Sequence, residues 1–182
     1  MRDWIALFSH TGTEIANVAN RLKIMPRRSI TNNTPGDPEG KVTSRVPHIM
    51  YVRGTPTEDE YNSFLTPEAL VTMHGWMRIV PESICNEYEI YNLHPGLITK
   101  YPDLKGKDPQ EKVFKMNNPP EHVGCVIHKA VGEVDSGEIY MERSTRNVFP
   151  SCDRLTEYLH DMASDMWVDF LTHKLCDPPV YG

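Results

Sequence analysis

Short apolar runs alternate with segments of helical spacing, and this alternation constrains the fold more than any other feature of the sequence. Each run has the length of a buried strand rather than that of a helix. Strands that alternate with helices favour a mostly parallel sheet flanked by helices. The predicted strands are Asp3–Phe8, Arg28–Thr31, His48–Val52, Ala69–Met73 and Glu89–Leu93.

The C-terminal part departs from this alternation. Gly124–Ala130 has a strand pattern, Val131–Gly137 is a tight acidic turn, and Glu138–Arg143 returns as a hairpin partner. Ser151 is the expected N-cap of a long final helix. We therefore expect an α/β sandwich whose mostly parallel sheet ends in an antiparallel hairpin. The final helix is expected to face the core through Leu155, Tyr158, Leu159, Met162, Met166, Phe170 and Leu171.

Several connecting segments carry local signals. Thr34–Val46 is rich in proline, glycine and charge, which predicts a surface loop. Thr57 and Glu60 have the spacing of a capping box, which predicts the start of a helix. Shorter helices are expected at Pro81–Asn86 and after Pro109.

Length and composition limit the classes of protein that fit. A chain of 182 residues, 39% hydrophobic and 24% charged, is typical of one globular domain, here residues 1–182. No apolar run approaches the roughly 18 residues that a membrane span needs, and the N-terminus lacks the features of a signal peptide. A net charge of -6 disfavours a nucleic-acid partner. Four widely spaced cysteines without a CxxC pair favour a reducing cytoplasm and argue against a zinc site.

Asn92 and His94 close the strand predicted at Glu89–Leu93, and Pro95-Gly96 turns the chain away directly after them. Residues two apart in an extended segment point to the same side, so a carboxamide and an imidazole face one space. In an open α/β sheet, ligands bind at the carboxyl ends of strands. A neutral donor beside a titratable ring suits a reaction that creates an oxyanion and moves a proton. The alternative is a strand end with a capping asparagine and a solvated histidine.

Two other segments are candidates for ligand binding. Ser9–Thr13 stands between a strand and a helix, where backbone amides can hold an anion. The alternative is that Thr13 is a simple N-cap. Trp76–Val80 is an apolar loop, which suggests either the wall of a pocket or a loop packed onto the core.

Three segments, in their order and spacing, resemble the folate-dependent formyltransferase family, and within it the members of the purine pathway. They are HGWMRIVPE (His74–Glu82), YNLHPGLITKYPDL (Tyr91–Leu104) and GCVIHKAVGEVDSG (Gly124–Gly137). The opening ALFSHTGTEI is similar to the family's first strand and phosphate loop, and the resemblance covers most of residues 3–143. It implies a Rossmann-like formyltransferase fold, 10-formyltetrahydrofolate as formyl donor, and no metal.

The resemblance also implies roles for particular residues. The catalytic trio would be Asn92, His94 and Asp135, with His94 held cationic by the carboxylate to stabilise the oxyanion. His128 matches a family position, as a supporting or a purely structural histidine. The folate would bind at Trp76, Met77, Arg78, Ile79, Val80, Val131, Gly132, Glu133 and Val134. The acceptor would bind at Thr11, Gly12, Thr13, Glu14, Lys105 and Lys107.

Some positions depart from the pattern of the purine-pathway members. Glu14 stands where they have an asparagine beside the acceptor's phosphate, and it would repel that phosphate if it faced inward. Glu58 replaces a basic residue, and Ala163 replaces a glutamate that contacts the acceptor. Lys105 and Lys107 could supply new contacts to an anion. The acceptor is therefore less constrained by the sequence than the donor.

Three functions follow from this resemblance. The first is formyl transfer to glycinamide ribonucleotide, a step of de novo purine biosynthesis in the cytoplasm. The second is formyl transfer to another amine, such as an amino sugar nucleotide or a modified nucleotide. The third is a non-catalytic folate- or nucleotide-binding module. Formylation of methionyl-tRNA is disfavoured by the negative charge and by the lack of a C-terminal RNA-binding domain, and a hydrolase by the chain length.

Overall fold

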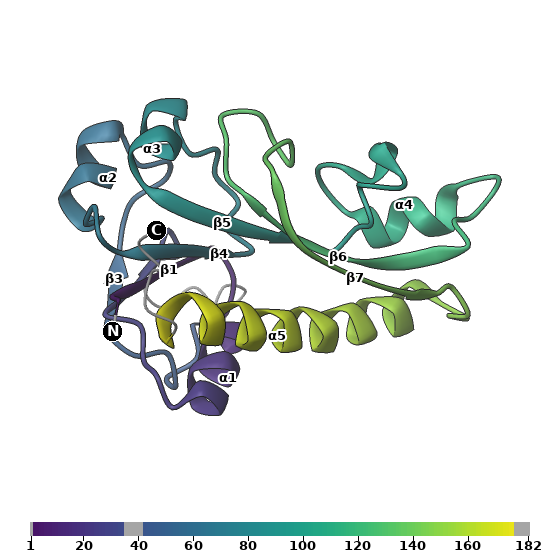
Figure 1. Cartoon of the computed structure of the whole chain (residues 1–182), viewed down its shortest axis with the longest axis horizontal. Helices are drawn as coiled ribbons and strands as arrows, with labels where there is room; N and C mark the ends of the chain where they lie inside the picture. The colour runs from purple at the N-terminus through teal and green to yellow at the C-terminus, as the bar shows by residue number, and fades with distance from the viewer. Residues whose placement is uncertain (1, 35–41, 177–182) are drawn as a thin grey trace, which may run out of the picture.

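A twisted sheet forms the centre of the protein (Figure 1). The structure, a computed structural model, describes residues 2–34 and 42–176, and these residues contain a sheet of seven strands in the order β3-β2-β1-β4-β5-β6-β7. Neighbours from β3 to β5 are parallel, whereas β6 and β7 are antiparallel, which confirms the predicted architecture. The strands are β1 Trp4–Phe8, β2 Arg28–Thr31, β3 Ile49–Tyr51, β4 Leu70–His74, β5 Glu89–His94, β6 His122–Lys129 and β7 Ile139–Arg146.

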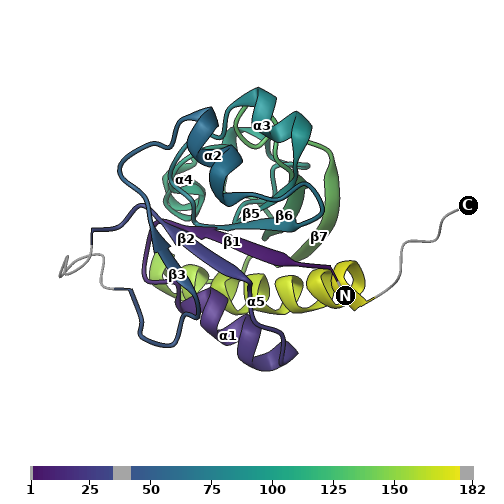
Figure 2. The same cartoon turned by 90° about the vertical axis from the view of Figure 1, so that its left-hand side faces the viewer.

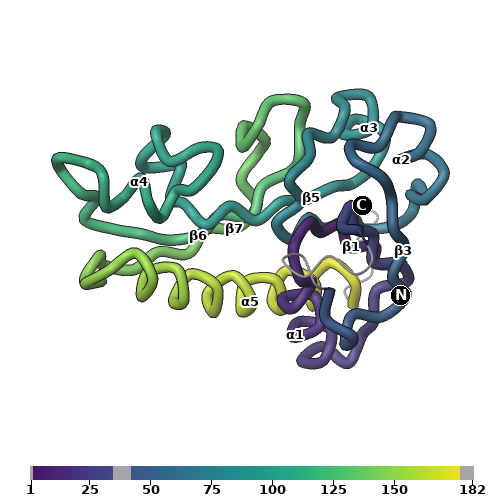
Figure 3. The backbone as a smooth tube through the Cα atoms, turned by 180° about the vertical axis from the view of Figure 1, so that it is seen from behind, coloured from purple at the N-terminus to yellow at the C-terminus, as the bar shows by residue number. Residues whose placement is uncertain are grey.

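Helices cover both faces of the sheet. Figure 2 shows α2 and α3 on one side, and α1 and α5 on the other. The long α5 follows the β6–β7 hairpin, which is also visible from behind in Figure 3, and α4 lies toward the far end of that hairpin. The helices are α1 Thr13–Leu22, α2 Glu58–Phe64, α3 Glu82–Glu87, α4 Pro109–Lys115 and α5 Cys152–Cys176, with a short 3-10 turn at Pro102–Leu104.

Strand β1 supplies side chains to two hydrophobic cores, one on each face of the sheet. Trp4 and Phe8 pack on the side of α1 and α5, where they join a core that includes Trp167. Ile5 and Leu7 pack on the opposite side with residues of α2 and α3. All of β1 is buried because both faces are covered, which explains why its sequence is a continuous apolar run.

Two capping signals were confirmed, at Thr57 and at Ser151, whose hydroxyl accepts from the Arg154 amide at 3.3 Å directly before α5. The side chain of Thr57 accepts a hydrogen bond from the Glu60 amide, and Glu60 bonds back to the Thr57 amide, as a capping box requires.

Two other expectations were wrong. Thr13 is the first residue of α1 rather than its cap, because Gly12, with a φ of 73°, is the N-cap. Tyr158 is 42% exposed and packs against Phe149 instead of facing the core.

Other boundaries differ slightly from expectation. His94 belongs to β5, and β7 extends to Arg146. Of the loop predicted at Thr34–Val46, residues 35–41 lie outside the described residues. No helix in the described part of the chain is long and apolar enough to cross a membrane.

The order of the strands places a ligand crevice at one edge of the sheet. From β1 the chain continues outward to β2 and β3 on one side, then returns to β4 on the other side. Phe8 at the end of β1 pairs with His74 at the end of β4, and Met73 pairs with Asn92. The ends of β1, β4 and β5 therefore lie together where the strand order reverses, which is where open α/β sheets bind ligands.

Candidate active site

A cleft of about 1110 Å³ opens at this edge of the sheet. Its centre contains Asn92 and His94 at the end of β5, and Asp135 from the turn between β6 and β7. One wall is formed by the loops after β4 and β6, and the other by the start of α1 and the middle of α5. The size suits two small-molecule substrates that meet at the three central side chains.

The three central side chains lie within contact distance of one another. His94 Nδ1 is 3.2 Å from Asp135 Oδ2, and Asn92 Nδ2 donates to Asp135 Oδ1 at 3.4 Å. The His94 ring and the Asp135 carboxylate are shielded from solvent, since His94 is 5% exposed and Asp135 is 7% exposed. Charge interactions in such a site are screened less than at the surface.

Asp135 is held by a tight turn and by several donors. Its φ of 50° is left-handed, a conformation that aspartate tolerates better than most residues. The Gly106 amide donates to Asp135 Oδ2 at 2.9 Å. Burial by itself raises the pKa of Asp135, but bonds from His128 and Gly106 and the charge of His94 together lower it. Asp135 is therefore an anion at neutral pH.

The direction of the His94 pKa runs against the expectation that this ring is held cationic. Burial lowers the pKa of His94 and outweighs the opposite effects of the Asp135 charge and of the Leu104 carbonyl. Nε2 lies 2.8 Å from the Leu104 oxygen and must carry a proton, because a carbonyl only accepts. In the neutral ring the basic nitrogen is thus Nδ1, beside the Asp135 carboxylate.

His128, which the resemblance matched to a family position with its role left open, joins this cluster. Its Nε2 lies 3.2 Å from Asp135 Oδ1 and 3.3 Å from Asn92 Nδ2, while Nδ1 donates to the Lys129 carbonyl. Asn92 and His128 are register partners across β5 and β6, so both point to the same face.

The predicted folate-binding residues form one wall of the cleft. Trp76 and Val80 are buried, and Trp76 Nε1 donates to the Tyr61 hydroxyl at 3.1 Å. Met77 and Ile79 are 42% and 65% exposed. In the same wall, the turn after β6 exposes two valines and also brings Gly132 and Glu133 to the cleft. The turn valines are Val131 and Val134.

Arg78 lies in the same loop but does not point into open space. Its Nε donates to the Gly54 carbonyl at 3.2 Å, and its NH1 donates to the Met77 carbonyl at 2.9 Å. The Met77 amide in turn donates to Ser9 Oγ at 2.8 Å. These bonds fix the loop against the segment after β1, so the apolar wall is preorganised.

The predicted acceptor-binding residues are not all in the same place. Thr11, Gly12, Thr13, Glu14 and Lys107 line the cleft. Lys105 does not line it, and its ammonium group bonds Ser136 Oγ at 3.0 Å instead.

Glu14 faces the cleft, which is the inward orientation considered from the sequence, but a partner holds its carboxylate. It is not turned outward, and its Oε1 lies 2.7 Å from Nδ1 of the buried His74.

Fold and site together define a class of protein: an α/β protein with a two-walled ligand cleft at the reversal point of a parallel sheet, and with an asparagine, histidine and aspartate at its centre. The family model described as formyl transferase matches residues 50–170, and the chain belongs to this family.

Solved structures of similar fold carry one recurring description. Phosphoribosylglycinamide formyltransferase from Streptococcus pneumoniae TIGR4 superposes with a TM-score of 0.77 at 17% identity, covering 96% of this chain and 99% of that one. The enzyme of the same name from Anaplasma phagocytophilum gives 0.77 at 21% identity, covering 97% and 89%. At these identities the likeness shows the fold alone.

Curated relatives carry two different descriptions. Phosphoribosylglycinamide formyltransferase of Dictyostelium discoideum is 35% identical over 81 residues, which are 41% of this chain and 39% of the relative. Methionyl-tRNA formyltransferase of Thermotoga sp. (strain RQ2) is 34% identical over 82 residues, which are 44% and 25%. The aligned segments thus span less than half of these relatives.

Proposed function

We propose that this protein transfers a formyl group from 10-formyltetrahydrofolate to the primary amine of glycinamide ribonucleotide, in de novo purine biosynthesis. The observation that carries the proposal is the contact between Asn92, His94 and Asp135 at the centre of a cleft with one apolar and one polar wall. Membership of the formyl transferase family and the descriptions of the similar proteins support it.

The central residues suit each step of such a transfer. The amine attacks the formyl carbon, and the formyl oxygen becomes an oxyanion that the Asn92 amide can stabilise. Neutral His94 accepts the amine's proton at Nδ1, where Asp135 stabilises the resulting imidazolium at 3.2 Å. The proton then passes to the leaving nitrogen of the folate as the old carbon–nitrogen bond breaks.

The apolar wall suits the donor. A flat pterin can lie between the exposed side chains of Met77 and Ile79 and those of Val131 and Val134, with backbone groups of the two loops at its polar edge. This placement rests on the shape and chemistry of the wall.

A different amine is the second candidate acceptor, and one observation favours it. Glu14 places a carboxylate in the acceptor wall, at the helix start where a phosphate would be expected to bind. An amino sugar nucleotide or a modified nucleotide could place another group there. A non-catalytic binding module is the third candidate, and its lack of turnover would distinguish it from the other two.

The test is an acceptor screen with 10-formyldideazafolate, following release of the deformylated product by absorbance. Turnover with glycinamide ribonucleotide that is abolished in His94→Ala supports the proposal. Turnover with only an amino sugar nucleotide would replace the acceptor and retain the chemistry. Tight folate binding without turnover on any amine would favour the binding module.

We further propose that the protein acts in the cytoplasm. All four cysteines are free in the structure, and Cys85 and Cys125 are buried. Free thiols are typical of proteins in a reducing compartment.

A further inference from the structure

Glu14 and His74 form a bridge across the reversal point of the sheet. Glu14 lies in the first turn of α1, directly after β1, and His74 is the last residue of β4. Glu14 Oε1 is 2.7 Å from His74 Nδ1. The His74 side chain is 1% exposed and that of Glu14 is 27% exposed, so the buried ring holds a carboxylate that faces the cleft.

The ring of His74 is itself fixed from behind. Its Nε2 lies 2.8 Å from the Thr72 hydroxyl, which accepts a hydrogen bond from Trp4 Nε1 at 2.7 Å. The Trp167 ring packs against His74 with centroids 4.7 Å apart. A side chain held on three sides has little freedom, and the carboxylate bonded to it is therefore positioned before any ligand arrives.

One oxygen of Glu14 remains available to a ligand. Oε1 takes the His74 contact, and no other group in the described parts of the chain bonds Oε2. A carboxylate oxygen accepts hydrogen bonds only, so its partner in the cleft must be a donor. A phosphate ester at this position would meet a like charge.

The rest of this wall has the same character. From α1 and α5 it presents the hydroxyls of Thr13, Thr156 and Ser164 and a second carboxylate, Asp161. Two histidines also reach the cleft, His10 and His160, and the described residues of these two helices bring no lysine or arginine to it. Such a surface suits a polyhydroxylated group better than an anion.

Glu14 lies apart from the reacting centre. Met73 and Asn92 are register partners, so they point to one face of the sheet, whereas His74 and Leu93 point to the other. The centre at Asn92 and His94 thus lies on the opposite face from the Glu14–His74 bridge. A molecule whose amine reaches that centre would place a different part beside Glu14.

We infer that Glu14, positioned by His74, accepts a hydrogen bond from a sugar hydroxyl of the amine acceptor at its free Oε2. The inference rests on the proposed function, because it concerns the acceptor of that reaction. Glu14 is then a specificity-determining residue, and His74 is a positioning residue that acts through it. The loss of one such bond lowers kcat/KM by roughly tenfold to a hundredfold.

The experiment compares glycinamide ribonucleotide with its 2′,3′-dideoxy analogue. Wild-type protein should prefer the hydroxylated acceptor by about tenfold or more. Glu14→Ala should remove most of this preference, mainly by raising KM for glycinamide ribonucleotide, and should change kcat/KM for the dideoxy acceptor much less. Glu157→Ala, which alters an exposed carboxylate of α5 outside the cleft, is the matched control. Equal losses on both acceptors, or no loss, would overturn the inference.

His74→Phe separates positioning from general stability. The single variant should reduce the hydroxyl preference to the level seen in Glu14→Ala. Combining the two substitutions should reduce the hydroxyl preference no further. A purely structural role would lower kcat/KM equally for both acceptors and would add to the effect of Glu14→Ala.

Calorimetric titration of the two acceptors without a donor separates this inference from the proposed function. Hydroxyl-dependent binding that is lost in Glu14→Ala, without turnover, would remove the formyl transfer and retain the subsite. Turnover without any hydroxyl preference would retain the formyl transfer and remove the subsite. If wild-type protein neither binds nor formylates either acceptor, both proposals fail.

Discussion

His94 ends β5 and Asp135 lies in the turn between β6 and β7, yet Nδ1 of the ring and Oδ2 of the carboxylate are 3.2 Å apart, and both side chains are buried. The β6–β7 turn delivers Asp135 to this point, and the Gly106 amide holds it there. The pair therefore combines a lowered histidine pKa, caused chiefly by burial, with an anion that stabilises the protonated ring. This combination suits a base that must accept a proton during the reaction and release it afterwards.

Replacing His94 by Ala should lower kcat by about two to four orders of magnitude, because proton transfer by a positioned side chain contributes on that scale. The donor's dissociation constant should change little. Steady-state kinetics of the purified variant give kcat, and calorimetry gives the dissociation constant of the donor. His122→Ala, at the other end of the β6 hairpin, is the control, and near-wild-type turnover of His94→Ala would remove His94 from the reaction.

Replacing Asn92 by Ala should lower kcat/KM. The corresponding loss of transition-state stabilisation should be about 3 kcal/mol, the usual contribution of one oxyanion donor. Its Nδ2 lies 3.4 Å from Asp135 and 3.3 Å from His128, so the amide is already oriented by the cluster. The loss should fall on kcat. A change confined to KM for the donor would make Asn92 a binding residue.

Replacing Asp135 by Asn should lower the pKa of His94 further, because the carboxylate is the main influence that raises it. The acid limb of the pH–rate profile should move to lower pH, and the maximal rate should fall because the protonated ring loses its counter-ion. Profiles of wild type and variant that share the same acid limb would show that the two groups are not coupled.

The same substitution should also change how stability depends on pH. The folded-state pKa of Asp135 is lowered from 3.8, so its contribution is present above that value and is lost as the pH falls through the folded pKa. In Asp135→Asn the free energy of unfolding should therefore decrease less steeply at acid pH. Denaturant titrations at several pH values measure this slope.

Replacing Ile79 by Asp should abolish folate binding without unfolding the protein, because the side chain is 65% exposed at the apolar wall. A charge there would have to be desolvated against the pterin. Val148→Asp is the matched control, since Val148 is 74% exposed and lies outside the cleft. Calorimetry with 10-formyldideazafolate gives the answer, and retained micromolar affinity would place the folate elsewhere.

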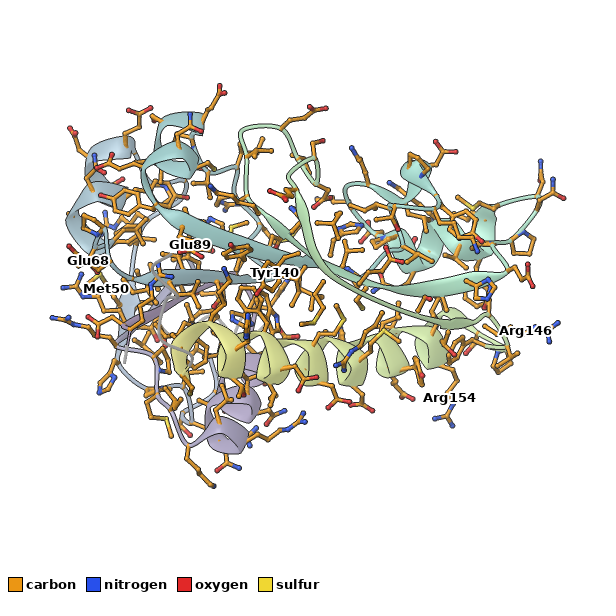
Figure 4. All side chains as sticks on the ribbon, in the orientation of Figure 1. Met50, Glu68, Glu89, Tyr140, Arg146 and Arg154 are labelled. Carbon is orange, nitrogen blue, oxygen red and sulfur yellow. The ribbon has the colours of Figure 1, made fainter. Side chains whose placement is uncertain are left out.

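Lys174 and Glu89 should stabilise the end of α5 against the sheet. The ammonium group is 3.1 Å from Glu89 and lies 4.6 Å from the centroid of the Tyr140 ring. Figure 4 labels Glu89 and Tyr140, which lie near one another above α5. Burial by itself raises the pKa of Glu89, but its bonds to Arg2 and Lys174 lower it overall, so the pair is charged at neutral pH.

A double-mutant cycle with Lys174→Met and Glu89→Gln should give a coupling of about 1 kcal/mol, because both side chains are mostly buried. The free energy of unfolding by urea is the measurement. The exposed pair Lys115 and Glu111, on α4, is the control and should couple more weakly. A larger coupling at the exposed pair would mean that burial does not strengthen the contact.

The sequence by itself determined the elements and the identity of the central residues. Period-two and helical spacings report which face of a segment is buried, and this depends on neighbours along the chain. For that reason the strand at Arg28–Thr31 and the capping box at Thr57 were predicted correctly. The resemblance named Asn92, His94 and Asp135, and the structure brings these three together.

Only the tertiary structure decided what those residues touch. The pKa of His94 depends on burial, which no local pattern reports, and burial opposes the imidazolium that was expected beside Asp135. Glu14 was expected to repel a phosphate if it faced inward. It does face the cleft, and strand order places the end of β4 beside it and supplies His74 as its partner. Charges act over distances in space, so their consequences appear only when the strands are paired.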